Sequence, residues 1–295
     1  MTTTLKSEFR KLLSVRSTYF ATALIIALTA LFTYFGTSRV YEEVQVTEAE
    51  MSAQQELPPE EVPTDMSQEQ KFIEPKLTNQ LPKNTILNHL QNAIGLIGFI
   101  SAIVAILLMA HEFRYNMITY TLTASNNRSK VLVSKILVVL AYSLVVSLIG
   151  IGTVVVTTYV AVGIKDLILP AQDYNWPYVI GRLLSYSVGF SLLGLALITL
   201  LRNITAGIVV LFVLPIVESI VGAILQGNNI QALKYLPVAA LTQVSSVGLL
   251  GESIQNFEGD TRPIISVTRG LVTFGVALIV VWAVSWYLFL RRDAN

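Results

Sequence analysis

The chain has 295 residues, of which 53% are apolar and only 13% are charged, and its net charge at pH 7 is +1. Soluble domains carry about 25% charged residues, so this composition argues against a soluble protein and favours one embedded in lipid, with no nucleic-acid partner. The absence of cysteine excludes disulfides and thiolate metal sites.

The N-terminal residues 1–17 predict an amphipathic interfacial helix. Leucine and phenylalanine side chains fall on one face, and serines with basic residues fall on the other. Such a helix lies in the headgroup layer with its basic face toward anionic lipid. The expected headgroup contacts, at both termini, are Lys6, Arg10, Lys11, Arg291 and Arg292.

Six apolar segments each reach the roughly 20 residues that a helix needs to cross a bilayer. They are residues 18–36, 86–110, 131–162, 179–201, 204–226 and 267–290. The sequence therefore predicts an all-α membrane protein with six transmembrane helices in one domain over residues 1–295. The first segment follows basic residues, as the core of a secretory signal peptide does. Because its apolar run exceeds the roughly 7–15 residues of such a core, we expect a retained anchor.

Residues 39–83 form an acidic loop between the first two segments. The loop holds ten carboxylates and five of the ten prolines, and it has no glycine. Thr47-Glu48-Ala49-Glu50 fits a capping box and predicts a short helix up to Pro58-Pro59. The loop is either a solvated, partly disordered segment or a cap over the outer mouth of the bundle.

The distribution of Lys and Arg predicts the orientation of the bundle, because these residues favour the cytoplasmic side. With the N-terminus inside, the cytoplasmic parts hold eleven basic and three acidic residues. The opposite side holds nine basic and fifteen acidic residues, with the intramembrane Glu218 set aside. Both termini are therefore predicted to be cytoplasmic, which agrees with an even number of spans.

The stretch from His111 to Lys130 follows the second apolar segment. Its start, "HEFRY", is one residue short of the HExxH zinc motif, and Tyr115 stands where the second histidine belongs. Aromatic, methionine and arginine side chains at helical spacing predict a short helix over 112–122 that presents them to a partner on the cytoplasmic face. The alternative is a surface helix packed only against its own bundle.

Two polar or small-residue features lie inside predicted spans. Glu218 is either a functional carboxylate facing a cavity, or a carboxylate near the outer interface that is hydrated or paired with another helix. Gly181, Ser185 and Gly189 form a face of small residues, which suits a seam between two permeases or packing within one chain.

The last outer loop, residues 227–266, is too apolar for a free loop. Pro237 and the glycines Gly248 and Gly251 predict short helices that dip into the outer leaflet.

Catalytic chemistry is not indicated by the sequence. It contains no G-x-x-x-x-G-K-[ST] motif, and its two histidines belong to opposite ends of one predicted span. We expect no catalytic residue, no metal and no cofactor bound by this chain, so any ATP and Mg²⁺ would be bound by a partner.

Together these features resemble the ABC-2 permease family, the membrane subunits of ABC transporters. The resemblance rests on the basic N-terminal helix, the large outer loop, the "LLRNIT" turn and "HEFRYNMITYTLTASNNRSKVLVSK", which looks like E-x-R…T-x-x-x-L…R-x-x-x…K. Asn116-Met117 stands where many relatives have Gly-Thr. The resemblance implies that residues 112–122 form a cytoplasmic coupling helix that contacts an ATP-binding subunit. The implied contact residues are Glu112, Phe113, Arg114, Tyr115, Met117 and Ile118.

The function implied by the resemblance is an ATP-driven exporter in a bacterial plasma membrane. It would combine two permeases, identical or different, with two ATP-binding subunits. The cargo stays open, although the acidic loop favours a cationic one. Two alternatives stay open as well: a scaffold or sensor that transports nothing, and an intramembrane enzyme or ion-coupled carrier that uses Glu218.

Overall fold

The computed structural model describes residues 2–55, 81–115, 128–170, 174–227, 235–247 and 266–291. Across these ranges the chain is helical, apart from short turns and one isolated bridge residue, Ile168. The helices are α1 (Thr2–Ser14), α2 (Arg16–Gln55), α3 (Thr85–Arg114), α5 (Arg128–Ile164), α6 (Trp176–Leu201), α7 (Ile204–Gly227), α8 (Pro237–Ser245) and α9 (Val267–Arg291).

Six of these helices are long and apolar enough to cross a membrane, by length and composition. They are residues Arg16–Tyr41 of α2, all of α3, Ser129–Ile164 of α5, all of α6, Ile204–Leu225 of α7 and all of α9. The prediction of an all-α chain with six candidate spans is therefore confirmed for the described part of the sequence, and it supports a multi-pass membrane protein.

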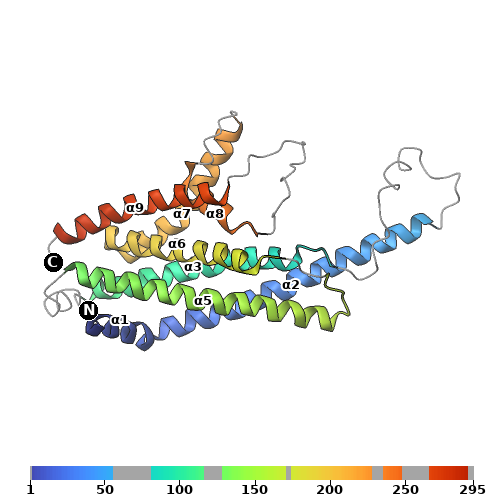
Figure 1. The fold of residues 1–295 in the computed structure, drawn as a ribbon, viewed down its shortest axis with the longest axis horizontal. Coiled ribbons are helices and arrows are strands. Elements are labelled where there is room, and N and C mark those ends of the chain that lie inside the picture. The colour runs from blue at the N-terminus through green and yellow to red at the C-terminus, as the bar shows by residue number, and fades with distance from the viewer. Residues whose placement is uncertain are drawn as a thin grey trace.

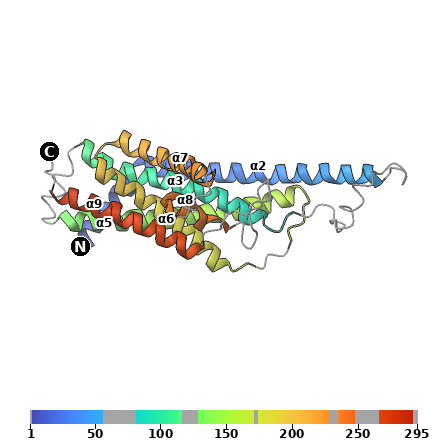
Figure 2. The same ribbon diagram turned by 90° about the horizontal axis from the view of Figure 1, so that it is seen from above.

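Helix α1 and the C-terminal end of α9 lie at the same end of the bundle (Figures 1 and 2). We call this the terminal end and the opposite one the distal end. An even number of crossings requires both termini on one side. Which side of a membrane the terminal end faces stays a prediction.

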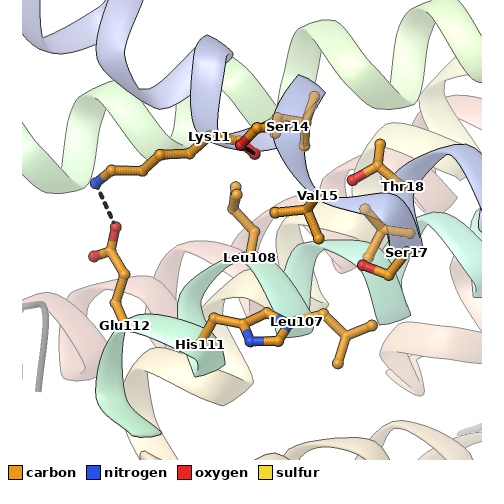
Figure 3. A pocket seen from close by; sticks show the side chains of 11 residues that line it. Lys11, Ser14, Val15, Ser17, Thr18, Leu107, Leu108, His111 and Glu112 are labelled. Carbon is orange, nitrogen blue, oxygen red and sulfur yellow. Dashed lines mark hydrogen bonds and ion pairs between the residues drawn. The ribbon is translucent and has the colours of Figure 1, made fainter. Parts of the chain in front are cut away.

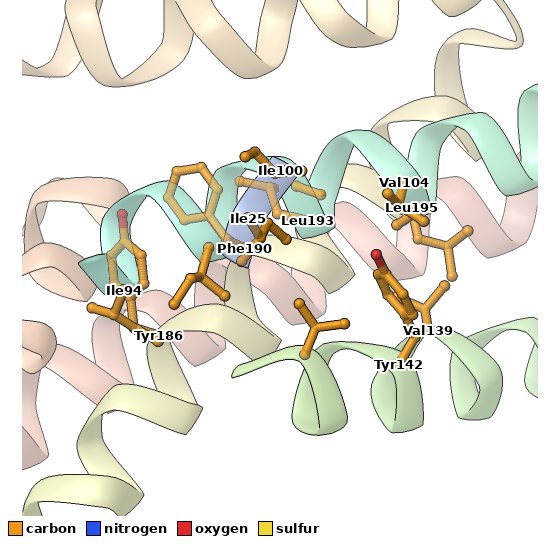
Figure 4. Packing of buried hydrophobic residues seen from close by; sticks show 14 of the residues in the cluster. Ile25, Ile94, Ile100, Val104, Val139, Tyr142, Tyr186, Phe190, Leu193 and Leu195 are labelled. Carbon is orange, nitrogen blue, oxygen red and sulfur yellow. The ribbon is translucent and has the colours of Figure 1, made fainter. Parts of the chain in front are cut away.

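Helices α3 and α6 form the centre of the bundle and pack closely against each other. Gly194 of α6 allows this approach, because a Cβ there would lie 2.6 Å from the carbonyl oxygen of Ala102 in α3. Figure 4 shows the surrounding apolar core. Its labelled residues are Ile25, Ile94, Ile100, Val104, Val139, Tyr142, Tyr186, Phe190, Leu193 and Leu195.

The predicted face of small residues on α6 packs against other helices at its Gly189 end, as far as the described residues show. Gly189 packs against Phe274 of α9 and Leu241 of α8. A Cβ added at Gly181 would meet nothing within 4 Å.

Helix α2 buries several threonines beside Ile25 and turns large aromatic residues outward. Thr29, Thr33 and Thr37 are buried, while Phe32 and Phe35 are more than half exposed. The buried hydroxyls of Thr29 and Thr37 donate to the carbonyl oxygens four residues earlier, and Thr37 also hydrogen-bonds to His89 of α3. The exposed aromatic face suits lipid or another apolar surface.

The first part of the predicted acidic loop is helical and belongs to α2. Helix α2 continues without a break to Gln55, so the separate short helix expected from the capping box at residues 47–50 is wrong. The physical reason is that no glycine or proline stands between Gly36 and Pro58, while good helix formers such as Glu, Gln, Ala and Met fill the interval. Residues 56–80 of the predicted loop lie outside the described residues.

The last outer loop contains a short helix, as predicted. Helix α8 starts with Pro237, which suits the first helical turn because its missing N–H would have no partner there. Residues 228–234 and 248–265 of this loop lie outside the described part.

Candidate functional site

Four charged side chains form a closed ring of ion pairs at the terminal end, which we call the ionic cluster. Helix α1 supplies Glu8 and Lys11, α3 supplies Glu112, and α5 supplies Lys135. The Lys11 Nζ atom lies 2.7 Å from Glu8 Oε1 and 2.7 Å from Glu112 Oε1. The Lys135 Nζ atom lies 2.8 Å from Glu8 Oε2 and 2.7 Å from Glu112 Oε1.

The ionic cluster is buried and electrically neutral. Glu8 and Lys135 are 0% exposed and Glu112 is 4% exposed, whereas the Lys11 side chain is 30% exposed to solvent. Desolvating a charge is costly, so the two carboxylates and two ammonium groups depend on one another. The Oε2 atom of Glu112 has no hydrogen-bond partner among the described residues.

The ionic cluster ties α1 to the two helix ends that flank residues 116–127. Glu112 lies in the last turn of α3 and Lys135 lies in the second turn of α5. Helix α1 bridges them through residues that are 101 and 127 positions away in sequence. A force applied to the connection between α3 and α5 would therefore also act on α1.

The electrostatics of the cluster appear in the pKa values of its α1 members. Burial alone would raise the pKa of the Glu8 carboxyl, but the charge of Lys135 and the hydrogen bonds from Lys11 and Lys135 outweigh it and hold this pKa below its ordinary value. Burial alone would lower the pKa of Lys11, but its hydrogen bonds to Glu112 and Glu8 raise this pKa above its ordinary value.

These shifts define the pH range in which α1 stays docked. The Glu8 pKa is lower in the folded chain, so its pairing stabilises docking above the unfolded value of about 4.3 and is lost as the pH falls through the folded value. The Lys11 pKa is higher in the folded chain, so its pairing is fully present below about 10.4 and is lost as the pH rises through the folded value.

We expect α1 to detach from the bundle in acid. The chain has no cysteine, so a spin label on Leu13→Cys, a position that is 55% exposed, reports the mobility of α1 alone. The mobile fraction should rise as the pH falls below the ordinary glutamate pKa of about 4.3 and reverse on neutralisation, because Glu8 becomes protonated. In Glu8→Gln the label should be mobile already at pH 7; the wild-type transition in that variant would contradict the assignment to Glu8.

A cavity of about 200 Å³ lies beside the ionic cluster, between the α1–α2 junction and α3. Figure 3 shows Lys11 reaching Glu112 at one side, with Ser14, Ser17 and His111 around the cavity. His111 stacks on Tyr115 with ring centroids 6.2 Å apart. No group of three metal-ligating side chains occurs in the described ranges.

The residues predicted to contact an ATP-binding subunit separate into three groups. Glu112 is turned into the ionic cluster, and Phe113 is partly buried, with the Arg202 guanidinium 5.6 Å from its ring centre. Arg114 and Tyr115 are exposed at the end of α3, Tyr115 by 60%. Residues 112–114 form the last turn of α3 rather than the start of another helix, and the rest of the predicted coupling helix, with Met117 and Ile118, lies outside the described residues.

The residues predicted to contact lipid headgroups also differ among themselves. Lys6 and Arg10 are exposed on α1, and Arg291 is exposed with its guanidinium 4.5 Å from the ring centre of Tyr287. Lys11 instead points into the ionic cluster, so its main partners are carboxylates of this chain. Arg292 lies outside the described residues.

Helix α8 is held at both ends by charged side chains of other helices. At its N-terminal end, Glu218 of α7 accepts a hydrogen bond of 2.9 Å from the backbone N–H of Ala239. At its C-terminal end, Arg182 of α6 donates to the carbonyl oxygens of Val244 (2.8 Å), Ser246 (3.2 Å) and Gln243 (3.3 Å). We call Arg182 and Glu218 the α8 clamp.

The α8 clamp satisfies backbone groups that a short helix leaves without partners at its two ends. A helix leaves N–H groups free at its start and C=O groups free at its end, and its dipole favours an anion at the start and a cation at the end. Arg182 and Glu218 are each 6% exposed, and they supply these charges. Of the two predicted roles for Glu218, pairing with another helix is the one that the geometry supports.

Three of the six charged residues in these two sites were not predicted as site residues. Glu8 and Lys135 entered the charge count of the predicted cytoplasmic side, and Arg182 entered that of the opposite side. The available signal was their position: Arg182 and Lys135 are lone basic residues close to or within apolar segments, where an unpaired charge is costly.

Comparison with known families adds one finding. A family model described as "Protein of unknown function (DUF2705)" matches residues 68–294. The chain belongs to the DUF2705 family. The matched range includes Glu112, Lys135 and the α8 clamp, and it leaves α1 outside. No curated protein matches the chain.

The expected membership of the ABC-2 permease family is wrong. DUF2705 is the family that matches, and no ABC-2 permease family was detected. The pattern that suggested it consists of single residues at loose spacing. Two of these residues, Glu112 and Lys135, pair with each other and with α1 in the ionic cluster. Their presence is therefore explained by this ion pairing and does not require membership of the ABC-2 permease family.

Proposed function

We propose that this DUF2705 chain is the membrane subunit of an ATP-driven transport complex, in which a separate chain binds and hydrolyses ATP with Mg²⁺. The observation that carries the proposal is the ionic cluster. It joins three helices at the terminal end, on either side of the connection between α3 and α5. A partner that moves this connection would move α1, α3 and α5 together, as a rigid lever requires.

The surface beside the ionic cluster supports a docking role for this end. Arg114 and Tyr115 project from the end of α3, and arginine and tyrosine are enriched among residues that contribute most to protein interfaces. The sequence carries no phosphate-binding loop motif of its own, so ATP would have to be bound by a partner. In this proposal the terminal end faces the cytoplasm of a bacterial cell, with Lys6, Arg10 and Arg291 against anionic lipid.

The exposed apolar faces support a further part of the proposal, a second permease. Helices α2, α7 and α9 expose Phe35, Ile216 and Ile279 by more than half. These faces suit lipid on one side and a second membrane subunit on another. A carrier mechanism based on Glu218 receives no comparable support, because the carboxylate is engaged by α8.

The experiment that tests the proposal is purification of the full chain from its native membrane in a mild detergent. We expect a protein with a phosphate-binding loop to co-purify and to hydrolyse ATP in the complex. If the chain purifies alone, or with partners that bind no nucleotide, the transport proposal fails and the scaffold or sensor alternative stands.

A further inference from the structure

A groove of about 580 Å³ lies between α2 and α3 toward the distal end, away from the ionic cluster. Close contact beside the groove fixes how α2 is aligned with α3, because a Cβ at Gly36 of α2 would lie 2.8 Å from the His89 Cε1 atom of α3. The hydroxyl of Thr37 and the Nε2 atom of His89 are hydrogen-bonded at 3.2 Å. The floor of the groove is therefore held by the two helices themselves.

The larger side chains that line the groove change from polar to apolar along its length. Arg39, Asn88 and Asn92 line the part nearer the distal end, and Phe32 and Leu96 line the part nearer the bundle centre, beside the buried threonines Thr29 and Thr33. The order follows from the antiparallel course of α2 and α3 (Figure 1). Leu96 lies about 12 Å deeper along α3 than Asn88, at 1.5 Å per residue.

The length of α3 relates this change to the depth of a membrane. Its 30 residues span about 45 Å, whereas the hydrocarbon core of a bilayer is about 30 Å thick. If the excess is shared between both ends, Asn88 lies at the level of the headgroups and Leu96 lies among the acyl chains. The groove therefore has the polarity of a lipid molecule at the matching depth.

The polar side chains that line the groove carry N–H groups that can donate hydrogen bonds. Arg39, Asn88 and Asn92 are exposed, so their side chains are accessible to a ligand. The guanidinium and the two amide groups all line this groove. A guanidinium matches a phosphate with two parallel hydrogen bonds, and amide groups add further donors.

We propose that the groove between α2 and α3 binds a phospholipid, with its phosphate at Arg39, Asn88 and Asn92 and an acyl chain along Phe32 and Leu96. Charge complementarity and the polarity gradient favour a lipid over a second copy of the chain, which would place an apolar helix against an exposed arginine. The volume falls within the roughly 300–1,000 Å³ of small-molecule sites. The site does not depend on ATP-driven transport.

The test uses the full chain in lipid nanodiscs with photoactivatable phosphatidylglycerol or with diacylglycerol that carries the same photoactivatable chain. Cross-linked peptides are identified by mass spectrometry. We expect phosphatidylglycerol to label residues 29–40 and 88–96 at least about fivefold more than diacylglycerol does, because only the former has a phosphate. Excess inorganic phosphate should leave this labelling unchanged.

Matched variants separate recognition from simple proximity. Arg39→Gln should lower labelling by phosphatidylglycerol at least about fivefold, and Arg39→Lys should give an intermediate level, because the positive charge remains but the paired guanidinium hydrogen bonds are lost. Lys83→Gln removes an exposed charge at the same end but outside the groove, and it should change nothing.

Three outcomes would overturn the proposal. Equal labelling by both lipids, or no effect of Arg39→Gln, would show ordinary lipid contact. Loss of labelling in inorganic phosphate would show a site for free phosphate. Cross-links between residues 29–40 of two copies would show that the groove belongs to a dimer interface.

Discussion

Replacing Lys135 by methionine is expected to destabilise the protein by about 3–5 kcal/mol, the cost of removing one partner from a buried ion pair. The change leaves Glu8 and Glu112 buried with the partly exposed Lys11 as their one cation in the cluster. Hydrogen exchange followed by mass spectrometry should show α1 amides exchanging at least about 100-fold faster than in the wild type, since each 1.4 kcal/mol is a factor of ten.

The same substitution at an exposed lysine of α1 provides the control. Lys6→Met should leave the exchange of α1 nearly unchanged, because the side chain is solvent-exposed. Adding Glu8→Gln to Lys135→Met restores neutrality and should recover part of the protection. Wild-type protection of α1 in Lys135→Met would show that the ionic cluster does not hold α1.

Replacing Arg182 by methionine is expected to release α8 at a cost of about 3 kcal/mol. Arg182 satisfies three backbone carbonyl oxygens at the end of α8, and an apolar side chain leaves them without a donor. The reporter is Ser245→Cys, a nearly isosteric change at a position that is 4% exposed, in a chain without other cysteines. Its maleimide labelling should become roughly 100-fold faster in Arg182→Met.

Arg269→Met is the matched control for the α8 clamp. Arg269 is exposed on α9, so its loss should leave the labelling of Ser245→Cys at the wild-type rate. Glu218→Gln keeps an oxygen that accepts from Ala239 and should have a smaller effect than Arg182→Met, about 1 kcal/mol. Equal labelling rates in Arg182→Met and Arg269→Met would contradict the clamp.

Hydrophobic length was enough to predict the spans. Each apolar segment is longer than the apolar run of a buried helix in a soluble domain. The six helices and their approximate ends could therefore be predicted. The first span shows the limit of this reading. Its inward face carries several buried threonines beside Ile25, so the large apolar residues that predict the span lie mostly on its outer face and say little about its packing.

The ionic cluster could not be predicted, because its contacts cross 101 and 127 positions of sequence. Lys11 was predicted to contact lipid headgroups, and Glu8 and Lys135 entered the charge count of the predicted cytoplasmic side. Only the packing of α1 against α3 and α5 turns these ordinary charges into a buried ring. The same holds for Glu112, which the sequence placed on the surface.

The α8 clamp was half predictable. The cost of a carboxylate in a span singled out Glu218, and Pro237 together with the apolar outer loop indicated a short helix. That the carboxylate lies at the start of that helix depends on how α7 packs against α8, which no local pattern encodes. The correct general inference was that an intramembrane charge needs a partner.

Cross-linking from Tyr115 tests the proposed docking role most directly. A photo-cross-linker on Tyr115→Cys, the one cysteine in the full chain, is activated in native membranes, and the captured proteins are identified. The account predicts capture of an ATP-binding protein, reduced when Lys135→Met is added because the helix end is then less firmly held. Capture of lipid alone, or of proteins that bind no nucleotide, would contradict it.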